Sequence, residues 1–517
     1  MSFRKSRRRR GLVLIVVTVL LLLISLGTLG LVSMVQTEYR ATRLRGVELE
    51  LENSAAAGRE YLLALASQSR STQVSLGGLT ANRELFLNRS INSTAEEVSE
   101  IRFSITPQGI PASGDENRLG PVNESAKLHL EQLLRWDREQ PGTGFQALMN
   151  LPGMTSDVAD AILDWVDADS TPRTNGAEAD RYASMGLSYS PRNAVPPVLD
   201  ELLLIPGVTA ELLLGESSTR SNSGSGTNPD ARPTRPSRSK SLAPRAGIDA
   251  NPRPWRDFLT VSSRERNENF EGQPRLYLNH PDLVELHQQI TDRLGSTWAN
   301  YVIAWRQFGP YRGRRGTTIE AWQPDLNQPA RFNFTSELEL VGSRVPVSRE
   351  NRSTKTLDSP LSAERVGWTG ELSRVLDEVS IDKSNTLPGR VNIELAPREV
   401  LIGIPGMDIV MVDRILSSRT LSADGSHSHA HPAWLLEQGI VDLPMMSRLL
   451  PRVTTGGDVW SGEIAAWQED YSLLIRDEFI IDAAGKTGRQ LYCKDLRDRA
   501  GSLPPEPSPA AVTQTRN

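Results

Sequence analysis

The chain is poor in groups that cross-link or catalyse. Its 517 residues include a single cysteine, Cys493, so no disulfide can form within it. Its net charge is only −5, which gives no bulk attraction to nucleic acid. The length is enough for two to four domains. Those domains have to be stabilised by packed cores or by a bound metal.

Sequence motifs typical of enzymes are missing as well. The chain has no Gly-rich phosphate loop of the P-loop or dinucleotide type and no Ser nucleophile elbow. Cys493 lies between Tyr492 and Lys494 in a predicted strand, and no recognisable catalytic His motif accompanies it. We therefore interpret Cys493 as a small buried residue rather than a nucleophile, and we do not expect an enzyme.

The most apolar stretch lies near the N-terminus. Six of the first ten residues are Arg or Lys, Gly11 follows, and the 24 residues 12–35 carry no charge. A helix of that length measures roughly 36 Å and can cross a hydrocarbon core of about 30 Å. Because the basic cluster lies on one side only, residues 1–10 are expected in the cytoplasm and the bulk of the chain outside. A signal-anchor helix and a secretory signal peptide are the alternatives, although residues 35–38 offer no small-residue cleavage site.

Beyond this segment the pattern predicts a helix first and strands last. Residues 38–70 continue the helix, since apolar positions recur at a helical period, and residues 122–134 begin a second helical region. Strands of the small sheet are expected at 84–87, 101–105, 462–467, 471–482 and 489–494, and further strands at 257–262, at 274–279 and within 332–347. We expect an α+β fold, with a long N-terminal helix on a small antiparallel sheet and a large, mainly helical insertion.

Three segments repeat a helix, a turn and a second helix. In each turn a proline ends one helix and a glycine permits the backbone angles that begin the next. The pairs are Pro152-Gly153, Pro206-Gly207 and Pro405-Gly406. We interpret them as helix-hairpin-helix, or SAM-like, units, with Thr155 or Ser156 capping the second helix of the first unit.

Helix-hairpin-helix units also bind DNA backbones through turn amides and nearby basic residues. Between residues 151 and 216, however, eleven acidic residues stand against three arginines, a balance that repels phosphates. Nucleic acid is therefore not an expected partner. A membrane-anchored hairpin-repeat protein that binds extracellular DNA during uptake is the alternative function.

Five carboxylates are concentrated in seventeen residues: Asp164, Asp167, Asp169, Glu178 and Asp180. Ca²⁺ takes six to eight oxygen ligands, and the loop contains Gly and Pro and can fold back on itself. The spacing is not that of an EF-hand, and a solvated acidic helix end is the alternative. Three alternating histidines offer transition-metal ligands or simply an exposed loop: His427, His429 and His431. A membrane-bound metal-dependent enzyme would need Asp164 or His429 for activity.

Composition and motifs divide the chain into nine parts. These are a basic leader (1–11), a transmembrane helix (12–35), a long helix with the first strands (36–120), a helical inserted domain (121–216), a flexible linker (217–255), a divergent mixed region (256–384), a second helix-hairpin-helix region (385–420), C-terminal strands (421–500) and a disordered tail (501–517).

The basic leader, Gly11 and the helix that continues beyond the membrane resemble the class III signal of type IV pilins and type II secretion pseudopilins. Segments 151–209 and 391–407 resemble the inserted domain and the strand-to-hairpin segment of the K-type minor pseudopilin. The resemblance implies cleavage by a prepilin peptidase between Gly11 and Leu12. Most members carry Glu at the fifth mature position, where this chain has Val16. That carboxylate pairs with the N-terminal amine of a neighbouring subunit, so a tip subunit should lack it.

The resemblance also implies a role. A K-type subunit would sit in the inner membrane, cap the tip of a periplasmic pseudopilus and assist export of folded proteins across the outer membrane. Its expected partners are other minor pseudopilins, with the secretin or a secreted substrate at the tip. Calcium binding by pseudopilins is implied too, whereas its placement at Asp164–Asp180 is our own hypothesis.

Overall fold

A computed structural model describes residues 10–90, 101–108, 119–215, 253–313, 317–350, 353–362, 368, 370–421, 429–468 and 473–496. Most of the predicted leader, residues 217–252 of the predicted linker, the predicted tail and His427 lie outside these ranges.

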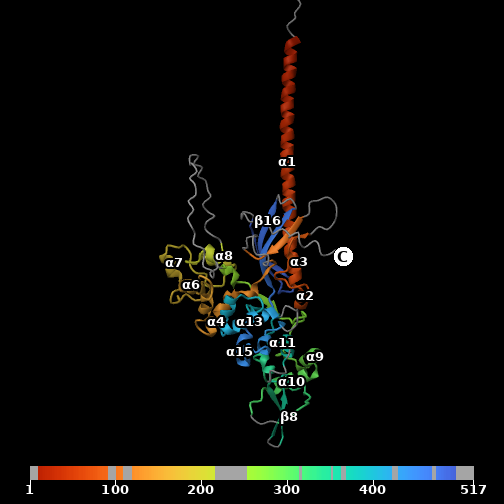
Figure 1. Cartoon of the computed structure of the whole chain (residues 1–517), viewed down its shortest axis with the longest axis vertical. Helices are drawn as coiled ribbons and strands as arrows, with labels where there is room; N and C mark the ends of the chain where they lie inside the picture. Colours follow the sequence, from red (N-terminus) through yellow and green to blue (C-terminus); the bar gives the residue numbers. More distant parts are fainter. Residues whose placement is uncertain are drawn as a thin grey trace, which may run out of the picture.

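The longest element is α1 (Arg10–Ala66), a single helix that confirms the predicted continuation beyond the apolar segment. Among the described residues, its Val13–Ala66 part is the one helix long and apolar enough to cross a membrane. The apolar side chains of residues 13–35 are exposed, whereas Leu51, Ala55 and Leu62 further along are fully buried. In Figure 1 α1 therefore stands as a stalk that joins the rest of the molecule through its C-terminal third.

The C-terminal third of α1 packs on a six-stranded antiparallel sheet. The strand order is β1-β2-β15-β16-β17, and β3 also pairs with β15. The strands are β1 (Arg89–Ser90), β2 (Ile101–Thr106), β3 (Val122–Asn123), β15 (Val459–Gln468), β16 (Leu474–Asp482) and β17 (Arg489–Asp495). Ile464 pairs with Ile105, so the two ends of the chain meet at the centre of the sheet. Strands 101–105, 462–467, 471–482 and 489–494 are thus confirmed within a few residues.

Close approach of α1 to the sheet depends on Gly58. A Cβ atom on this residue would lie 2.3 Å from Ile464 Cδ1 and 2.9 Å from Phe103 Cδ2. The core between them includes Leu51 and Phe479, both fully buried. The absent side chain at residue 58 lets helix and sheet come into direct contact.

The insertion between β3 and β15 builds a second, larger core. Its helices are α4 (Leu130–Glu139), α5 (Thr143–Met149), α6 (Ser156–Val166), α7 (Ala179–Ser184), α8 (Ala210–Leu214), α9 (Leu283–Leu294), α10 (Ser296–Phe308), α11 (Glu371–Glu378), α12 (Arg398–Ile402), α13 (Ile409–Leu421), α14 (Trp434–Glu437) and α15 (Leu443–Leu449). Short 3-10 segments lie at η1 (Glu124–Ala126), η2 (Leu199–Leu204), η4 (Trp255–Asp257) and η5 (Glu337–Leu340).

Short strands tie these helices together. They are β4 (Leu128–His129), β5 (Leu259–Thr260), β6 (Arg264–Arg266), β7 (Leu276–Tyr277), β8 (Thr317–Ile319), β9 (Arg344–Glu350), β10 (Ser353–Asp358), β11 (Val379–Ser380), β12 (Thr386–Pro388), β13 (Val391–Asn392) and β14 (Val453–Thr454). They form one three-stranded sheet, β8-β10-β9, and four two-stranded pairs. The insertion is therefore mixed rather than purely helical, because the 256–384 region contributes most of these strands.

The first two Pro-Gly turns pack reciprocally. Gly153 has φ 69°, and a Cβ atom on it would meet the side chain of Leu212 in α8. Gly207 has φ 93°, and a Cβ atom on it would meet the side chain of Val158 in α6. Thr155 caps α6 as predicted, accepting a hydrogen bond from the backbone N–H of Val158. In the second unit the first helix is a 3-10 segment. The assignment of these units to the helix-hairpin-helix class stays a prediction.

Three local predictions were wrong. Residues 84–87 do not form a strand: α3 (Arg83–Phe86) is a helical turn, because the Asn82 side chain accepts the backbone N–H of Leu85. Residues 122–134 begin as a strand on β15, and helix starts only at Leu130. Cys493 is exposed rather than buried, since β17 ends the path of the sheet and pairs with β16 alone among the described strands.

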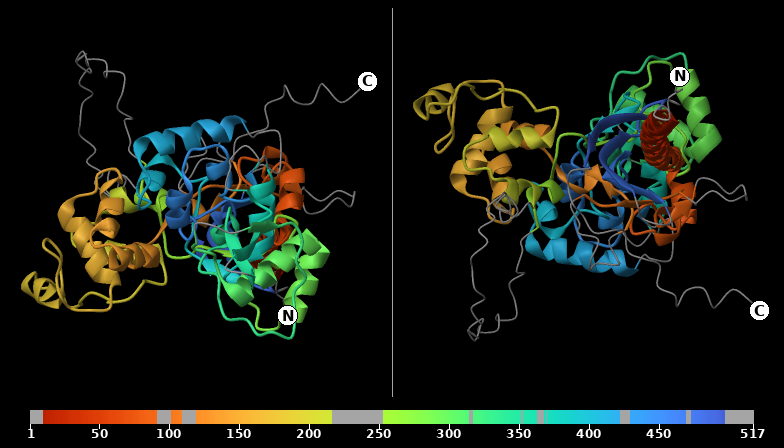
Figure 2. Two further views of the ribbon diagram at one scale, coloured as in Figure 1. Left: turned by 90° about the horizontal axis from the view of Figure 1, so that it is seen from below. Right: turned by 90° about the horizontal axis from the view of Figure 1, so that it is seen from above.

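The larger core lies beyond and beside the end of the stalk. In Figure 1 α9, α10 and β8 are farthest from the start of α1. Both views in Figure 2 place the α4–α8 segment well to one side of the α1 axis. Residues 119–453 thus make a head much wider than the helix that carries it.

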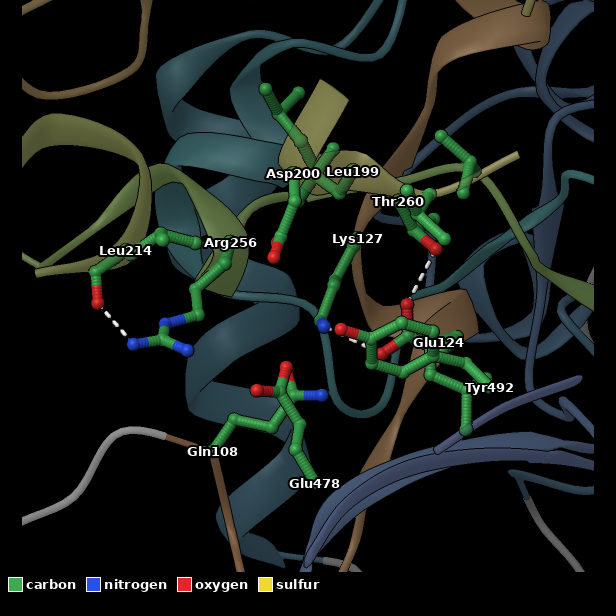
Figure 3. Close-up of a pocket in the computed structure, with 14 residues that line it drawn as sticks. Gln108, Glu124, Lys127, Leu199, Asp200, Leu214, Arg256, Thr260, Glu478 and Tyr492 are labelled. Carbon is green, nitrogen blue, oxygen red and sulfur yellow. Dashed lines mark hydrogen bonds and ion pairs between the residues drawn. The ribbon is translucent and has the colours of Figure 1, made fainter. Parts of the chain in front are cut away.

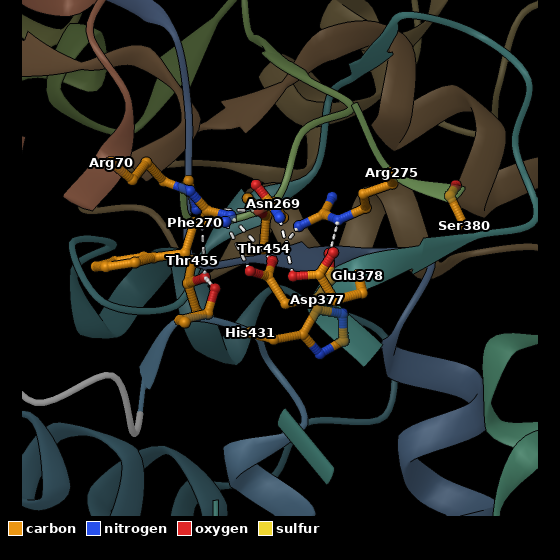
Figure 4. A network of polar contacts seen from close by, with 12 residues as sticks. Arg70, Asn269, Phe270, Arg275, Asp377, Glu378, Ser380, His431, Thr454 and Thr455 are labelled. Carbon is orange, nitrogen blue, oxygen red and sulfur yellow. Dashed lines mark hydrogen bonds and ion pairs between the residues drawn. The ribbon is translucent and has the colours of Figure 1, made fainter. Parts of the chain in front are cut away.

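A buried polar network joins the stalk to the head (Figure 4). Helix α2 (Arg70–Ser75) follows α1, and Arg70 bonds both Thr455 and Asp377. Arg275 donates to the same Asp377 carboxylate at 2.7 Å, and the backbone N–H of Phe270 donates to it at 2.6 Å. Asp377 therefore fixes three separate segments at one point.

Candidate functional site: the acidic loop of the inserted domain

The predicted calcium ligands lie in and after α6. The Thr155 cap sets where this helix begins, so Asp160 and Asp164, four residues apart, share one of its faces. Both side chains are buried and point to the loop that returns from residue 167 to residue 178. The acidic helix end is therefore a folded structure and not a solvated one.

Arg173 lies at the centre of the carboxylates. Its Nη1 donates to Asp164 Oδ1 at 2.8 Å and also to Asp167 Oδ2, while its Nη2 lies 3.4 Å from Asp137 Oδ2 of α4. Asp164 is completely buried. A buried carboxylate needs a partner of opposite charge, and here a side chain of the same loop supplies it.

Backbone amides complete the binding of these carboxylates. Asp164 Oδ2 accepts the N–H of Ala177 at 2.9 Å, and Asp160 Oδ2 accepts the N–H of Asn175 at 3.0 Å. A Cβ atom at Gly176 would lie 1.8 Å from Asp164 Oδ2, so only glycine allows this approach. The loop is closed on α6 by its own backbone.

The remaining predicted ligands are divided. Asp169 is exposed and accepts the N–H of Thr171, and Asp180 is exposed on α7. Asp167 Oδ1 and Glu178 Oε1, in contrast, are buried and have no hydrogen-bond partner among the described residues. The Oδ1 atom of Asn193, whose Nδ2 donates to Asp169 O, is likewise buried without a partner.

The electrostatics follow from this crowding. Burial raises the pKa of Glu178 to about 7, and the nearby carboxylates of Asp164 and Asp167 act in the same direction. Burial also raises the pKa of Asp167, although its hydrogen bond with Arg173 opposes that shift. Despite burial, the Asp167 and Asp164 carboxylates raise the pKa of Arg173, which stays charged. Because a single guanidinium faces several carboxylates, the loop keeps an excess of negative charge.

The described structure does not gather three or more of these five carboxylates into one group of metal ligands. Among the described residues, no group of three or more His, Cys, Asp or Glu side chains is placed to hold a metal ion. Arg173 lies between Asp164 and Asp167, and both oxygens of Asp164 accept hydrogen bonds. Calcium binding stays a prediction.

Of the three alternating histidines, the structure describes His429 and His431. His429 stacks on Trp434 at 4.1 Å between ring centroids, and its Nδ1 lies 3.1 Å from Glu394. His431 is buried and accepts the N–H of Ala433. Burial, with the positive charges of nearby arginines, holds the pKa of His431 well below its usual value, so it is neutral. Each has a structural environment of its own.

Sequence reasoning missed three residues of this site: Arg173, Asp160 and Asp137. Arg173 was visible only as one of three arginines among many acids, and nothing in its spacing marks it as their counter-ion. Asp160 had a signal, since it precedes Asp164 by four residues on a helix. Asp137 lies on another helix, and no local pattern links it to the loop.

The predicted cleavage residues Gly11 and Leu12 lie in the first turns of α1, and Val16 is 59% exposed on the apolar surface of that helix. These features define a class of protein. It is an α+β protein with one long apolar N-terminal helix, which fits a single-pass membrane anchor, on an antiparallel sheet with a large insertion.

Comparison with known proteins shows what the inserted domain is similar to. The sequence model of a family described as “Type II secretion system (T2SS), protein K” matches residues 126–215. A protein named “Type II secretion system protein K”, from Pectobacterium carotovorum subsp. carotovorum, is 34% identical over 76 residues. That alignment covers 14% of this chain and 23% of the relative. This domain, which contains α4–α8 and the acidic loop, is therefore similar to part of the type II secretion protein K family.

Proposed function

We propose that this chain is a type II secretion component, a minor pseudopilin that caps the tip of the pseudopilus and assists export of folded proteins across the outer membrane. The observation that carries the proposal is the width of the head relative to the stalk. In Figure 2 the α4–α8 segment lies to the side of α1, in the space that a subunit packed alongside within a filament would need. A subunit of this shape fits at an end of the filament.

The apolar segment supports the same position. Pilin-type subunits within a filament neutralise a carboxylate in lipid by pairing it with a neighbour's N-terminal amine. Val16 offers no carboxylate, and its side chain lies on an exposed apolar surface of α1. A subunit without another ahead of it has no need of that pair.

The remaining parts of the proposal follow from the anchor. α1 holds the chain in the inner membrane, with the N-terminus cytoplasmic and the head periplasmic. A prepilin peptidase cuts between Gly11 and Leu12. Other minor pseudopilins pack against α1, and the far end of the head meets secretin or a secreted substrate. Bound calcium would offset the negative charge of the acidic loop, where Asp167 and Glu178 each have a buried oxygen with no hydrogen-bond partner among the described residues.

The test is to purify the full chain from membranes of a cell with the intact secretion system. N-terminal sequencing should start at Leu12, and other minor pseudopilins should copurify in a fixed ratio. A Gly11→Val variant should keep Met1 and fail to restore secretion in a strain that lacks the chain. An intact Met1 in the parent chain would contradict the proposal. So would normal secretion by a strain that lacks the chain.

DNA binding is disfavoured by the packing of the turns. Gly153 and Gly207 face side chains of the opposite unit, and the carbonyl of Pro152 accepts a hydrogen bond from Trp255 Nε1 at 2.8 Å. Salt-dependent binding of duplex DNA by the purified chain would favour the uptake alternative instead.

A further inference from the structure

Three arginines follow the apolar segment of α1: Arg40, Arg43 and Arg45. All three are exposed, and within the described part of the chain no carboxylate forms an ion pair with any of them. Glu38 is the one acid among residues 36–47, whereas Glu48, Glu50 and Glu52 follow directly. The exposed helix therefore changes from basic to acidic with distance from the apolar segment.

The arginines are spread around the helix. At about 100° per residue, Arg43 lies about 60° from Arg40 on one side, and Arg45 lies about 140° from Arg40 on the other. A partner helix contacts a stripe of roughly 100°. One packed helix therefore cannot contact all three guanidiniums, whereas a lipid surface surrounds a single helix on every side.

Their distance from the apolar segment fits lipid headgroups. At about 1.5 Å per residue, Arg40 follows Val35 by about 7.5 Å and Arg45 by about 15 Å. The polar zone of a leaflet is about 5–8 Å deep, and long arginine side chains reach back along the helix to it. Tyr39, 70% exposed, lies at the level where aromatic residues anchor membrane helices.

We propose that Arg40, Arg43 and Arg45 bind the phosphates of anionic lipids in the leaflet on the head side of the membrane. Because residues 13–35 carry no charge and cleavage after Gly11 would remove the leader, these arginines are the basic groups that fix the depth of α1 in the bilayer. The inference rests on the membrane-anchor part of the proposed function and not on the tip position.

The experiment measures lipid binding by the full chain in detergent, titrated with phosphatidylglycerol or phosphatidylcholine and read by native mass spectrometry. The parent chain should prefer phosphatidylglycerol, and the preference should fall at high salt. A juxtamembrane arginine near an anionic surface contributes roughly a fivefold change in affinity, so R40Q/R43Q/R45Q should weaken phosphatidylglycerol binding at least tenfold.

The control removes three exposed arginines away from the apolar segment, Arg83 in α3 and Arg138 and Arg374 on the head, as R83Q/R138Q/R374Q, and should leave lipid preference unchanged. Glutamine is a good helix former, so the stalk variant keeps its fold, and an unchanged circular dichroism spectrum checks this. Equal lipid preference in parent and stalk variant would overturn the proposal. The proposal would also be overturned if the stalk variant kept its lipid preference but no longer copurified with other pseudopilins. That result would assign the arginines to a protein partner.

Discussion

The two hydrophobic cores of this protein are assembled in different ways. The smaller one lies between α1 and the sheet, and it brings Phe103 near one end of the chain against Ile464 near the other. The larger one is built from the intervening residues, mostly by short elements close in sequence. The sheet therefore joins strands that the whole insertion separates in sequence.

The junction between the cores is polar. Asp377 binds Arg70 from the stalk and Arg275 from the head, and Asp377 is only 6% exposed. An ion pair of this kind contributes orientation more than net stability, because both charges lose their hydration. We therefore expect the stalk and the head to respond separately to substitutions within their cores.

The largest expected effect is in the head. Asp164→Ala leaves Arg173 without its buried partner and removes acceptors for backbone N–H groups, so the unfolding free energy of the inserted domain should fall by about 3–5 kcal/mol. Denaturant unfolding followed by tryptophan fluorescence measures it. Asp180→Ala, at an exposed position, should change stability by less than about 0.5 kcal/mol. Equal effects of the two variants would mean that Arg173 does not hold the loop.

The second effect tests the stalk. Gly58→Ala puts a methyl group against Ile464 and Phe103, so overpacking should cost about 1–3 kcal/mol. Thermal unfolding of the detergent-solubilised chain measures the shift. Gly46→Ala is the matched control: a Cβ atom on Gly46 would have no neighbour within 4 Å, and alanine there should stabilise the helix slightly. If Gly58→Ala lowered the stability of both cores equally, the stalk and the head would be one cooperative unit.

A smaller effect concerns the start of α6. Thr155→Ala removes the side chain that accepts the N–H of Val158, and loss of such a cap costs about 1 kcal/mol. The loss should be confined to the head and seen by denaturant unfolding. Ser156→Ala at the next, partly exposed residue should have little effect, because Ser156 makes no capping bond. A larger loss from Ser156→Ala would move the cap by one residue.

The smallest effect is a pH dependence where the head meets the sheet (Figure 3). Glu478 of β16 lines a cavity of about 40 Å³ with Arg256 and Asp200. Burial raises the pKa of Glu478, opposed by Arg256 and supported by Asp200. The folded state therefore binds the proton more tightly, and the unfolding free energy should fall as pH rises above about 4.5 through the folded pKa. Glu478→Gln should flatten that slope in urea titrations at several pH values; an unchanged slope would place the titration elsewhere.

The stalk was the most predictable part of the fold. A long uncharged segment followed by apolar residues at helical spacing predicts one helix, and short apolar runs bounded by turn residues in 462–467 and 471–482 predict strands. Residues 84–87 failed because a single capping side chain, Asn82, turned a short apolar run into a helical turn. The prediction that Cys493 is buried was wrong because burial on an edge strand depends on which other segments cover it, and the local sequence does not show this.

The site was predicted only in part. The acidic cluster was located correctly in the inserted domain, but the positions of its charges depend on contacts across the chain. Asp137 reaches Arg173 from α4, 36 residues away in sequence. Gly176 is required because its backbone lies so close to the Asp164 carboxylate that no side chain fits there. No pattern in the sequence predicts that close approach. Side chains that balance charge across a loop are found only once the loop is folded.

The central claim is that a wide head on a stalk with Val16 begins a filament and does not extend one. Immunogold labelling of isolated pseudopili, with antibody against the head, tests it directly. Gold at one end of each filament is the predicted result. Gold repeated along the length of the filaments would contradict the account.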